Sequence, residues 1–518
     1  MQDMKIKKLE FGTAGIRGKL GKNEDHLNYA HVQRVAHGFS NYLLNKYPNQ
    51  EIKIAIGRDN RRMSYSFAIC CAMILNNYGI KVFFSKDITP TPFVSYAILK
   101  NKMQGGINIT ASHNPAEYNG IKLYNEMGSQ CLPKEIDEMT SFFESYEKYD
   151  ENFNIQKLTK KTFKNINFFS KKMKDSYIDE ICNIANDIDT DNIKLAYSPL
   201  HGTGSKFAPQ IFEKLGLGEN VYFVKKQMKI DRNFTHCSYP NPEKQDAYIM
   251  LEKLARKNNC DLFLVTDPDS DRVGLGIKHN DKYVLLNGNE TATLIANFVI
   301  NVLNKDSMNI NNTKYMVHSY VSSNMPAIIA KEKNIDSYVV PTGFKWIGMI
   351  INEQSKQNRE CIYAFEESYG SLNKEFVSRD KDALQSVVIL PRMVSYYKKQ
   401  GKTLVDVLND IYEKYGYIVS GNIEIEIEAG INLEDLQNRF KNLNFENQII
   451  VDYNKKDNFL KSNMIKIEFT DDNSWLALRP SGTEPKIKYY IFAFGKTQTA
   501  AQEKFDFFKT KIIGSNKN

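Results

Sequence analysis

A serine with a histidine beside it stands directly after an apolar run in the first quarter of the chain. Residues 110–115 read TASHNP and follow the run GGINI. A serine hydroxyl is a weak nucleophile until a base or a metal ion assists it. Ser112 is therefore a candidate nucleophile, with His113 next to it and Lys122 ten residues on as a candidate acid or base. The surroundings are not the GxSxG elbow of hydrolases, and a capped turn is the plain structural alternative.

Three aspartates follow a second apolar run at alternating positions. Asp267, Asp269 and Asp271 come directly after the run LFLVT, which reads as a buried strand. Carboxylates this close repel one another unless a cation lies between them, and hard oxygen ligands favour Mg²⁺ or Mn²⁺. A calcium-binding EF-hand is excluded, because the sixth and twelfth positions of such a loop are Arg272 and Lys278. The alternatives are a solvated acidic turn and, for Arg272, pairing with a carboxylate or with a substrate phosphate.

A third polar cluster follows the run WLAL near the end of the chain. Residues 479–486 read RPSGTEPK. Gly482 lets the backbone approach an anion closely, and Ser481 and Thr483 add hydroxyl donors. Arg479 adds a planar guanidinium whose geometry suits a phosphate. The cluster predicts a phosphate-binding loop, and a tight turn rich in Pro and Gly is the structural alternative.

Two further clusters could hold the hydroxyl groups of a sugar. Glu366 and Ser368 follow the run IYAF and place a carboxylate and a hydroxyl two residues apart. The segment TGFK, with Thr342, Gly343 and Lys345, could complete such a sugar site. Read alone, each cluster favours a structural role over a functional one.

Short apolar runs and helical patterns must position these clusters. We expect strands at 52–56, 80–84, 194–197, 314–317 and 423–427, helices at 29–43, 65–77 and 499–512, and a lysine-rich helical connector at 147–191. Alternation of strand and helix predicts parallel α/β layers. Functional side chains gather at the carboxyl ends of the strands of such sheets.

Size and composition favour a soluble enzyme with several domains. A chain of 518 residues is too long for one core, and 42% hydrophobic and 25% charged residues are ordinary for a globular protein. The net charge of +8 suits small anionic substrates, and without a dense Lys/Arg block no nucleic-acid partner is expected. No signal peptide, membrane span or CxxC pair is evident, so we expect a cytoplasmic protein with free thiols.

Taken together and in order, these clusters resemble those of the α-D-phosphohexomutase family. The resemblance covers nearly the whole chain and is most like the longer phosphoglucomutase and phosphopentomutase group. It rests on FGTAGIRG at 11–18, GRD at 57–59, the Ser112 motif, PLHG at 199–202, the Asp267 loop, NGNE at 287–290, TGFK at 342–345, the Glu366 motif, RDKD at 379–382 and the Arg479 loop.

The resemblance implies an α/β fold of four domains around a central cleft. Three related α/β domains with mixed sheets would carry the catalytic serine (1–190), the metal-binding loop (191–310) and the sugar-binding loop (311–420). A smaller carboxyl-terminal α+β domain (421–518) would bind phosphate.

The resemblance also implies a role for each candidate residue. Ser112 would carry a phosphoryl group, and one Mg²⁺ would be held by that phosphate together with Asp267, Asp269 and Asp271. The other roles implied are catalysis by Arg17, His113, Lys122 as a proton shuttle and Lys381 as a second acid or base, and substrate binding by Arg272, Thr342, Gly343, Lys345, Glu366, Ser368, Arg479, Ser481, Gly482 and Thr483.

The activity implied is interconversion of a hexose 1-phosphate and its 6-phosphate through a sugar 1,6-bisphosphate. A glucose-type or pentose-type enzyme is favoured, because many bacterial phosphomannomutases have GEMS where this chain has FEES at 365–368, and glucose 1-phosphate ranks first among the sugars. Mannose 1-phosphate stays open, as do ribose and deoxyribose 1-phosphate for a phosphopentomutase. The competing classes are a metal-dependent phosphatase with Asp267 as nucleophile and a phosphosugar-binding protein without catalysis. The expected partner is the phosphosugar alone, with no membrane association, in a monomer or a homodimer.

Overall fold

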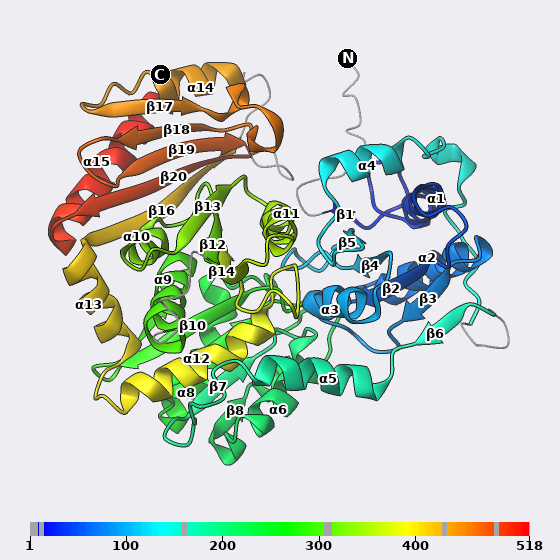
Figure 1. The fold of residues 1–518 in the computed structure, drawn as a ribbon, viewed down its shortest axis with the longest axis horizontal. Coiled ribbons are helices and arrows are strands. Elements are labelled where there is room, and N and C mark those ends of the chain that lie inside the picture. The colour runs from blue at the N-terminus through cyan, green and yellow to red at the C-terminus, as the bar shows by residue number, and fades with distance from the viewer. Residues whose placement is uncertain are drawn as a thin grey trace.

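Four β-sheets follow one another along the chain, each with its own helices. The computed structural model describes residues 9, 15–157, 163–304, 313–426, 433–480 and 486–516. In Figure 1 the first sheet lies at the right in blue, and the fourth lies at the upper left in orange and red. Ser481, Gly482 and Thr483, which the sequence assigns to the phosphate-binding loop, lie outside the described residues.

The first sheet has the strand order β1-β5-β4-β2-β3-β6, in which β5 runs antiparallel to both of its neighbours, β1 and β4, and the remaining pairs are parallel. Its elements are β1 (Ile16–Lys19), α1 (Tyr29–Lys46), β2 (Lys53–Arg58), α2 (Ser64–Asn77), β3 (Lys81–Phe84), α3 (Thr91–Asn101), β4 (Gly105–Ile109), β5 (Tyr118–Asn125), α4 (Pro133–Thr140) and β6 (Ile166–Phe168). The region expected to be only a helical connector therefore also contains a strand, β6, which completes this sheet.

The second and third sheets repeat the same local order. The second, β11-β10-β9-β7-β8, is built from α5 (Lys171–Cys182), β7 (Leu195–Ser198), α6 (Gly204–Lys214), β8 (Val221–Phe223), α7 (Lys225–Met228), α8 (Ile249–Asn258), β9 (Leu262–Thr266), β10 (Val273–His279), β11 (Lys282–Leu286) and α9 (Gly288–Phe298). The third, β13-β12-β14-β15, is built from β12 (Lys314–Ser319), α10 (Met325–Glu332), β13 (Asp336–Val340), α11 (Phe344–Ser355), β14 (Glu360–Glu366), β15 (Gly370–Leu372), α12 (Ala383–Lys398) and α13 (Leu404–Tyr415).

The fourth sheet is entirely antiparallel and has the order β16-β20-β19-β18-β17. It consists of β16 (Tyr417–Glu426), α14 (Leu433–Lys441), β17 (Gln448–Asp452), β18 (Ile465–Phe469), β19 (Trp475–Pro480), β20 (Lys486–Gly495) and α15 (Gln498–Asn516). Exposure along β16 alternates from Gly421 to Glu426, as the IEIE pattern predicts for a strand with one open face. The strand begins four residues before position 421, so the expected start of the last domain falls inside it.

One connection recurs in the first three sheets and carries the candidate site residues. In each sheet a parallel inner strand is followed along the chain by an antiparallel neighbour: β4 by β5, β9 by β10 and β14 by β15. The connecting turns contain Ser112, the aspartate trio and Ser368, respectively. Three turns at equivalent places in three sheets therefore carry candidate site residues, a serine in the first and third and the aspartates in the second.

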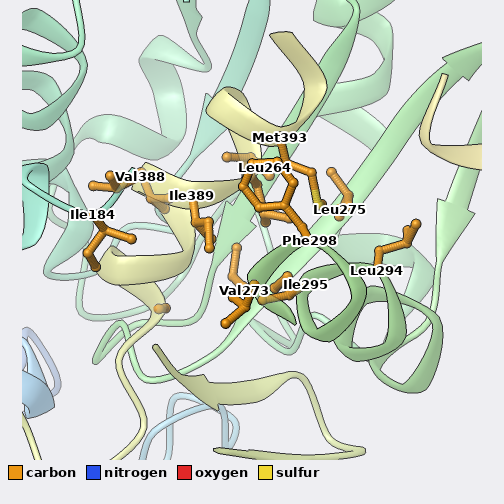
Figure 2. Packing of buried hydrophobic residues seen from close by; sticks show 14 of the residues in the cluster. Ile184, Leu264, Val273, Leu275, Leu294, Ile295, Phe298, Val388, Ile389 and Met393 are labelled. Carbon is orange, nitrogen blue, oxygen red and sulfur yellow. The ribbon is translucent and has the colours of Figure 1, made fainter. Parts of the chain in front are cut away.

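The largest hydrophobic cluster joins the second and third sheets into one core. Figure 2 shows part of it, where Leu264 and Leu275 of the second sheet pack between Phe298 of α9 and Met393 of α12. Nearly every residue of α12 is buried. Because α12 begins two residues after Lys381, this packing fixes the segment that carries that lysine. None of the helices described here is long and apolar enough to span a bilayer.

Candidate active site

Ser112 is fully buried and its backbone is in the left-handed region, with φ = +51°. Its Oγ donates a hydrogen bond to Asp267 Oδ2 over 2.7 Å and lies 3.2 Å from His113 Nδ1. Its backbone N–H donates to Thr110 Oγ1 over 2.8 Å. A non-glycine residue in this conformation is strained, so surrounding contacts must hold it in place. The turn thus fixes the serine hydroxyl against the second sheet.

His113 is neutral in this environment. Burial lowers the pKa of the imidazole well below its usual range, and the charges of Arg272 and Arg17 lower it further. A neutral imidazole has one free acceptor nitrogen. His113 can therefore accept a hydrogen bond from a hydroxyl in the cleft, but its low pKa makes it a weak base.

The aspartate trio forms a buried cluster whose carboxylate oxygens lie within 4.8 Å of one another. Oδ1 of Asp267 accepts from the backbone N–H groups of Asp271 and Arg272, each over 3.0 Å, which leaves Oδ2 to face Ser112. Among the described residues, Oδ1 of Asp269 and Oδ1 of Asp271 have no hydrogen-bond partner although they are buried. Buried carboxylate oxygens without a partner are costly. The donor set therefore fits one divalent cation with oxygen ligands.

Lys122 provides positive charge inside this cluster. Its Nζ donates to Asp269 Oδ2 and to Asp271 Oδ2, each over 2.8 Å, and Lys381 Nζ lies 3.5 Å from Asp271 Oδ2. Burial disfavours the ammonium, but the two carboxylates outweigh it and raise the pKa of Lys122. No lysine in the described part of the chain pairs with Asp267 in this way. Burial, followed by repulsion from Asp269 and Asp271, raises the pKa of its carboxyl well above the usual range, so negative charge at this position still needs a counter-charge.

Thr91, at the start of α3, ties the first sheet to the aspartate loop. Its backbone N–H donates to the carbonyl of Asp269 over 2.8 Å, and its hydroxyl donates to Asp269 Oδ2 over 2.7 Å. Asn108 Nδ2 donates to the same hydroxyl over 2.8 Å. Neither Thr91 nor Asn108 was predicted as a site residue, because their role arises only when two domains meet.

A cleft of about 400 Å³ opens above these buried groups and takes residues from all four sheets. Its lining includes the predicted residues Arg17, His113, Arg272, Thr342, Gly343, Glu366, Ser368, Lys381 and Arg479. Arg17 donates to Asn114 Oδ1 over 3.1 Å, and Arg272 donates to Glu243 Oε1 over 2.8 Å. The structure thus brings residues from each of the separate clusters around one cavity, whereas Ser112, Lys122 and the aspartate trio are not among the described residues that line it.

The predicted sugar residues on the third sheet are held by short contacts of their own. The backbone N–H of Gly343 donates to Glu366 Oε1 over 2.6 Å, and φ at Gly343 is +117°, a conformation that favours glycine. Ser368 Oγ donates to Glu367 Oε1 over 3.3 Å. Lys345 is the exception: it is half-buried beside Trp346, its Nζ 5.6 Å from the ring centre, and it is not among the described residues that line the cleft.

The PLHG segment at 199–202 packs closely against the aspartate loop. A Cβ atom on Gly202 would lie 2.3 Å from Cα and 2.4 Å from the carbonyl oxygen of Pro268. Thr203 N–H donates to that carbonyl over 2.7 Å, and Thr203 Oγ1 lies 2.9 Å from Ser270 Oγ. Glycine at position 202 therefore permits the close approach that places the aspartates.

Sequence reasoning missed several charged residues of the cleft. They are Glu243, Lys244, Glu424, Lys486 and Lys488. Lys488 Nζ forms an ion pair with Glu424 Oε1 over 2.7 Å. The pattern KIK at 486–488 was the available signal, because alternate residues of a strand share a face. For Glu243 and Lys244 the sequence offers no comparable signal, since they follow no apolar strand.

Known proteins resemble this chain in both sequence and fold. Models of the phosphoglucomutase/phosphomannomutase family match the chain at 8–150 (α/β/α domain I), 175–280 (domain II) and 287–415 (domain III). A phosphoglucomutase from Staphylococcus saprophyticus is 34% identical over 509 residues, covering 93% of this chain and 90% of that protein. A Staphylococcus aureus phosphoglucomutase is likewise 34% identical, covering 93% and 89%.

Solved structures share the fold at lower identity. The open form of the Paramecium phosphoglucomutase parafusin has a TM-score of 0.74 at 17% identity, covering 98% of this chain and 95% of that one. An N-acetylphosphoglucosamine mutase from Aspergillus fumigatus, solved with GlcNAc-6P and magnesium, has a TM-score of 0.54 at 12% identity, covering 98% and 96%. From the family models and the curated relatives, the chain belongs to the α-D-phosphohexomutase family and is a phosphosugar mutase.

Proposed function

We propose that this mutase interconverts glucose 1-phosphate and glucose 6-phosphate, with Ser112 as the phosphoryl carrier and glucose 1,6-bisphosphate as the intermediate. The observation that carries the proposal is the 2.7 Å hydrogen bond between Ser112 Oγ and Asp267 Oδ2 beside the cleft. It places the hydroxyl at the carboxylate cluster that is suited to a divalent cation. The staphylococcal relatives, which are named phosphoglucomutases, support glucose as the sugar.

In the proposed reaction, the free hydroxyl of a bound glucose phosphate attacks phosphoserine 112. The bond between phosphorus and Ser112 Oγ breaks as the bond to the sugar oxygen forms, which yields the bisphosphate. The attacking hydroxyl loses its proton, and the serine oxygen gains one. The reverse transfer, from the other end of the intermediate, regenerates phosphoserine. Such a transfer requires in-line geometry and neutralised charge.

Two lysines are candidates for moving these protons, and His113, with Nδ1 3.2 Å from Ser112 Oγ, can hydrogen-bond the serine oxygen. Lys122 is held in its charged form by two carboxylates and can donate one to the departing serine oxygen. Lys381 lies at the edge of the same cluster and lines the cleft, where it can serve the sugar hydroxyl.

We propose that the resident cation is a single Mg²⁺, held by Asp267, Asp269, Asp271 and the phosphate on Ser112. The unpartnered Oδ1 atoms of Asp269 and Asp271 support this assignment. When bound, Mg²⁺ neutralises charge on the transferring phosphoryl group. Arg17, whose guanidinium lies on the cleft wall with Asn114, adds positive charge from this chain.

The phosphate that is not reacting is proposed to bind at Arg479, with the loop from Ser481 to Thr483. Glu366 and Ser368 are proposed to hold sugar hydroxyls between the two ends of the cleft. Both ends of the bisphosphate must fit in turn, so contacts to phosphate and hydroxyl groups that do not depend on one ring orientation suit the reaction. The remote phosphate contact supplies binding energy away from the reacting atoms.

Rates on a panel of sugar phosphates test the proposal. Purified protein with Mg²⁺ and a trace of glucose 1,6-bisphosphate would be assayed with glucose, mannose, ribose and deoxyribose 1-phosphates. We expect the highest kcat/KM with glucose 1-phosphate. Preference for a pentose phosphate would make the protein a phosphopentomutase, and release of inorganic phosphate without isomer formation would overturn the mutase mechanism.

A further inference from the structure

Arg61, in the loop between β2 and α2, donates hydrogen bonds to the turn between β4 and β5 that carries Ser112. Its side chain is fully buried. Nη2 donates to the carbonyl oxygens of Ser112 and Asn114 over 2.6 and 2.5 Å. Nη1 donates to those of Pro115 and Tyr118 over 2.7 and 3.2 Å. One guanidinium therefore binds four carbonyl groups, three in the turn between β4 and β5 and one at the first residue of β5.

The fifth donor of Arg61 faces a buried carboxylate. Nε lies 3.1 Å from Oδ2 of Asp59, whose other oxygen accepts from the Arg61 N–H over 2.9 Å and from Ser64 Oγ over 2.6 Å. The Asp59 N–H donates to the carbonyl of Ile109, the last residue of β4, over 3.0 Å. The ion pair is thus tied to the strand that ends just before the serine turn.

A second domain closes over the same guanidinium. The ring of Phe234 lies with its centre 5.0 Å from Cζ of Arg61. A buried arginine keeps its charge, so it must be surrounded by acceptors and π-faces rather than by apolar groups alone. The four Nη hydrogen bonds of Arg61 are directed at the serine turn and the start of β5, and its Nε forms an ion pair with Asp59 without a hydrogen bond. Arg61 is not among the described residues that line the cleft.

The contacts of Arg61 help to hold the strained backbone of Ser112 in its observed conformation. The carbonyl of Ser112 is bound by Arg61, its N–H by Thr110 and its Oγ by Asp267. Without the guanidinium, each of the four carbonyls would lose a donor, with Pro115 keeping only the N–H of Tyr118, and the turn would relax toward a less strained conformation. The hydroxyl would then move away from the aspartate loop.

We propose that Arg61 is a positioning residue for phosphoryl transfer: it holds the serine turn in the conformation that presents Ser112 Oγ to the aspartate cluster. The inference rests on the proposed role of Ser112 as phosphoryl carrier. It predicts that loss of the guanidinium lowers the rate of transfer and leaves sugar-phosphate binding nearly intact, because the substrate contacts lie elsewhere in the cleft.

The test compares Arg61→Lys with Arg62→Lys. A lysine at position 61 keeps the charge, but it is a point donor without the planar fork that spans four carbonyls. Arg62 is the matched control, because it is exposed and its guanidinium contacts Asn233 at the same domain boundary, away from the serine turn. Asp59→Asn is a second, milder variant, since it removes the ion pair with Arg61 while keeping the shape of the side chain.

Two quantities would be measured for each folded variant: kcat and KM with glucose 1-phosphate, and the rate at which glucose 1,6-bisphosphate phosphorylates the dephosphorylated protein, followed by intact mass. For Arg61→Lys we expect kcat and the phosphorylation rate to fall about 100-fold, as for a displacement of about 1 Å. KM should change less than about threefold. For Asp59→Asn the fall in kcat and in the phosphorylation rate should be smaller, and for Arg62→Lys both rates should equal those of wild type.

The outcomes separate this inference from the proposed function. An inactive wild type with an inactive Arg62→Lys would overturn the proposed function itself. An active wild type with an equally active Arg61→Lys would overturn the positioning role. Circular dichroism gives the fraction of Arg61→Lys that is folded. If the activity of the variant fell only in proportion to that fraction, with kcat per folded molecule unchanged, the positioning role would also be overturned.

Discussion

The hydroxyl of Ser112 donates a hydrogen bond to Oδ2 of Asp267 over 2.7 Å, although 155 residues separate the two in sequence. The contact joins the turn of the first sheet to the turn of the second. Both side chains are fully buried, so their relative position depends on the packing of two domains rather than on either turn alone. Disturbing either turn should therefore affect the chemistry of both.

Replacing Ser112 with alanine should abolish phosphoryl transfer. With no oxygen to carry the phosphoryl group, we expect kcat to fall by at least about 10⁴-fold, while the fold is retained. A coupled assay of glucose 6-phosphate formation gives kcat. Intact mass should show one phosphoryl group on wild type incubated with glucose 1,6-bisphosphate and none on the variant. Transfer of phosphate to the alanine variant would contradict the assignment.

Replacing Asp269 with asparagine should weaken the cation site. The variant removes one negative charge and one anionic ligand, so the Mg²⁺ concentration for half-maximal activity should rise about 10- to 100-fold. Titration of the activity with Mg²⁺ measures this. Asp246→Asn is the control, because Asp246 is exposed and lies outside the cluster. An unchanged response to Mg²⁺ in Asp269→Asn would remove Asp269 from the site.

Replacing Arg479 with alanine should act mainly on substrate binding. Loss of a charge-assisted contact to the remote phosphate corresponds to about a 10- to 100-fold rise in KM, with a smaller fall in kcat. Steady-state kinetics with glucose 1-phosphate test this, with the exposed Arg439 of α14 changed to alanine as the control. A normal KM in Arg479→Ala would argue against a phosphate contact at this residue.

Asp382 should make stability depend on pH. Burial raises the pKa of this carboxyl to about 7 in the folded protein, against about 4 when unfolded. Between these values the folded state binds the extra proton, so its contribution to stability is present at low pH and is lost as pH rises through about 7. Wild type should lose about 1–2 kcal/mol relative to Asp382→Asn between pH 5 and 6.5. Urea unfolding at several pH values measures the difference, and a difference that does not vary with pH would refute it.

Replacing Gly202 with alanine should displace the aspartate loop. The new methyl group would meet the Pro268 backbone at 2.3 Å, which requires movement and costs about 1–3 kcal/mol of stability. We expect a lower melting temperature together with weaker Mg²⁺ activation. Gly514→Ala is the control, because a Cβ atom there meets nothing within 4 Å. Equal melting temperatures for the two variants would exclude the predicted clash.

The turns that carry Ser112, Asp267 and Glu366 could be predicted from the sequence because each follows a short apolar strand. Strands of this kind are local features, and their carboxyl ends gather at one edge of a sheet. Arg17 and Lys381, to which the family resemblance assigns catalytic roles, line the cleft, and those roles stay predictions. The family itself was also identified from these motifs.

Other features depend on contacts between domains and carry no local signal. Thr91 reaches Asp269 only because α3 packs against the second sheet, and Glu243 reaches Arg272 from an irregular loop. Lys345 was placed in the sugar site by its motif, but in the structure it lies beside Trp346, away from the lining of the cleft. The strand β6 was missed because its three residues lie in a polar, lysine-rich region.

The shared strand order of the first three sheets has a consequence for how the enzyme can diversify. Each proposed chemical task belongs to one hairpin, but the hairpin between β14 and β15 is also hydrogen-bonded to the second sheet, because the Val273 N–H donates to the Tyr369 carbonyl over 3.1 Å. Selection for a new sugar in this hairpin would therefore have to preserve its fit to the strand that follows the aspartates.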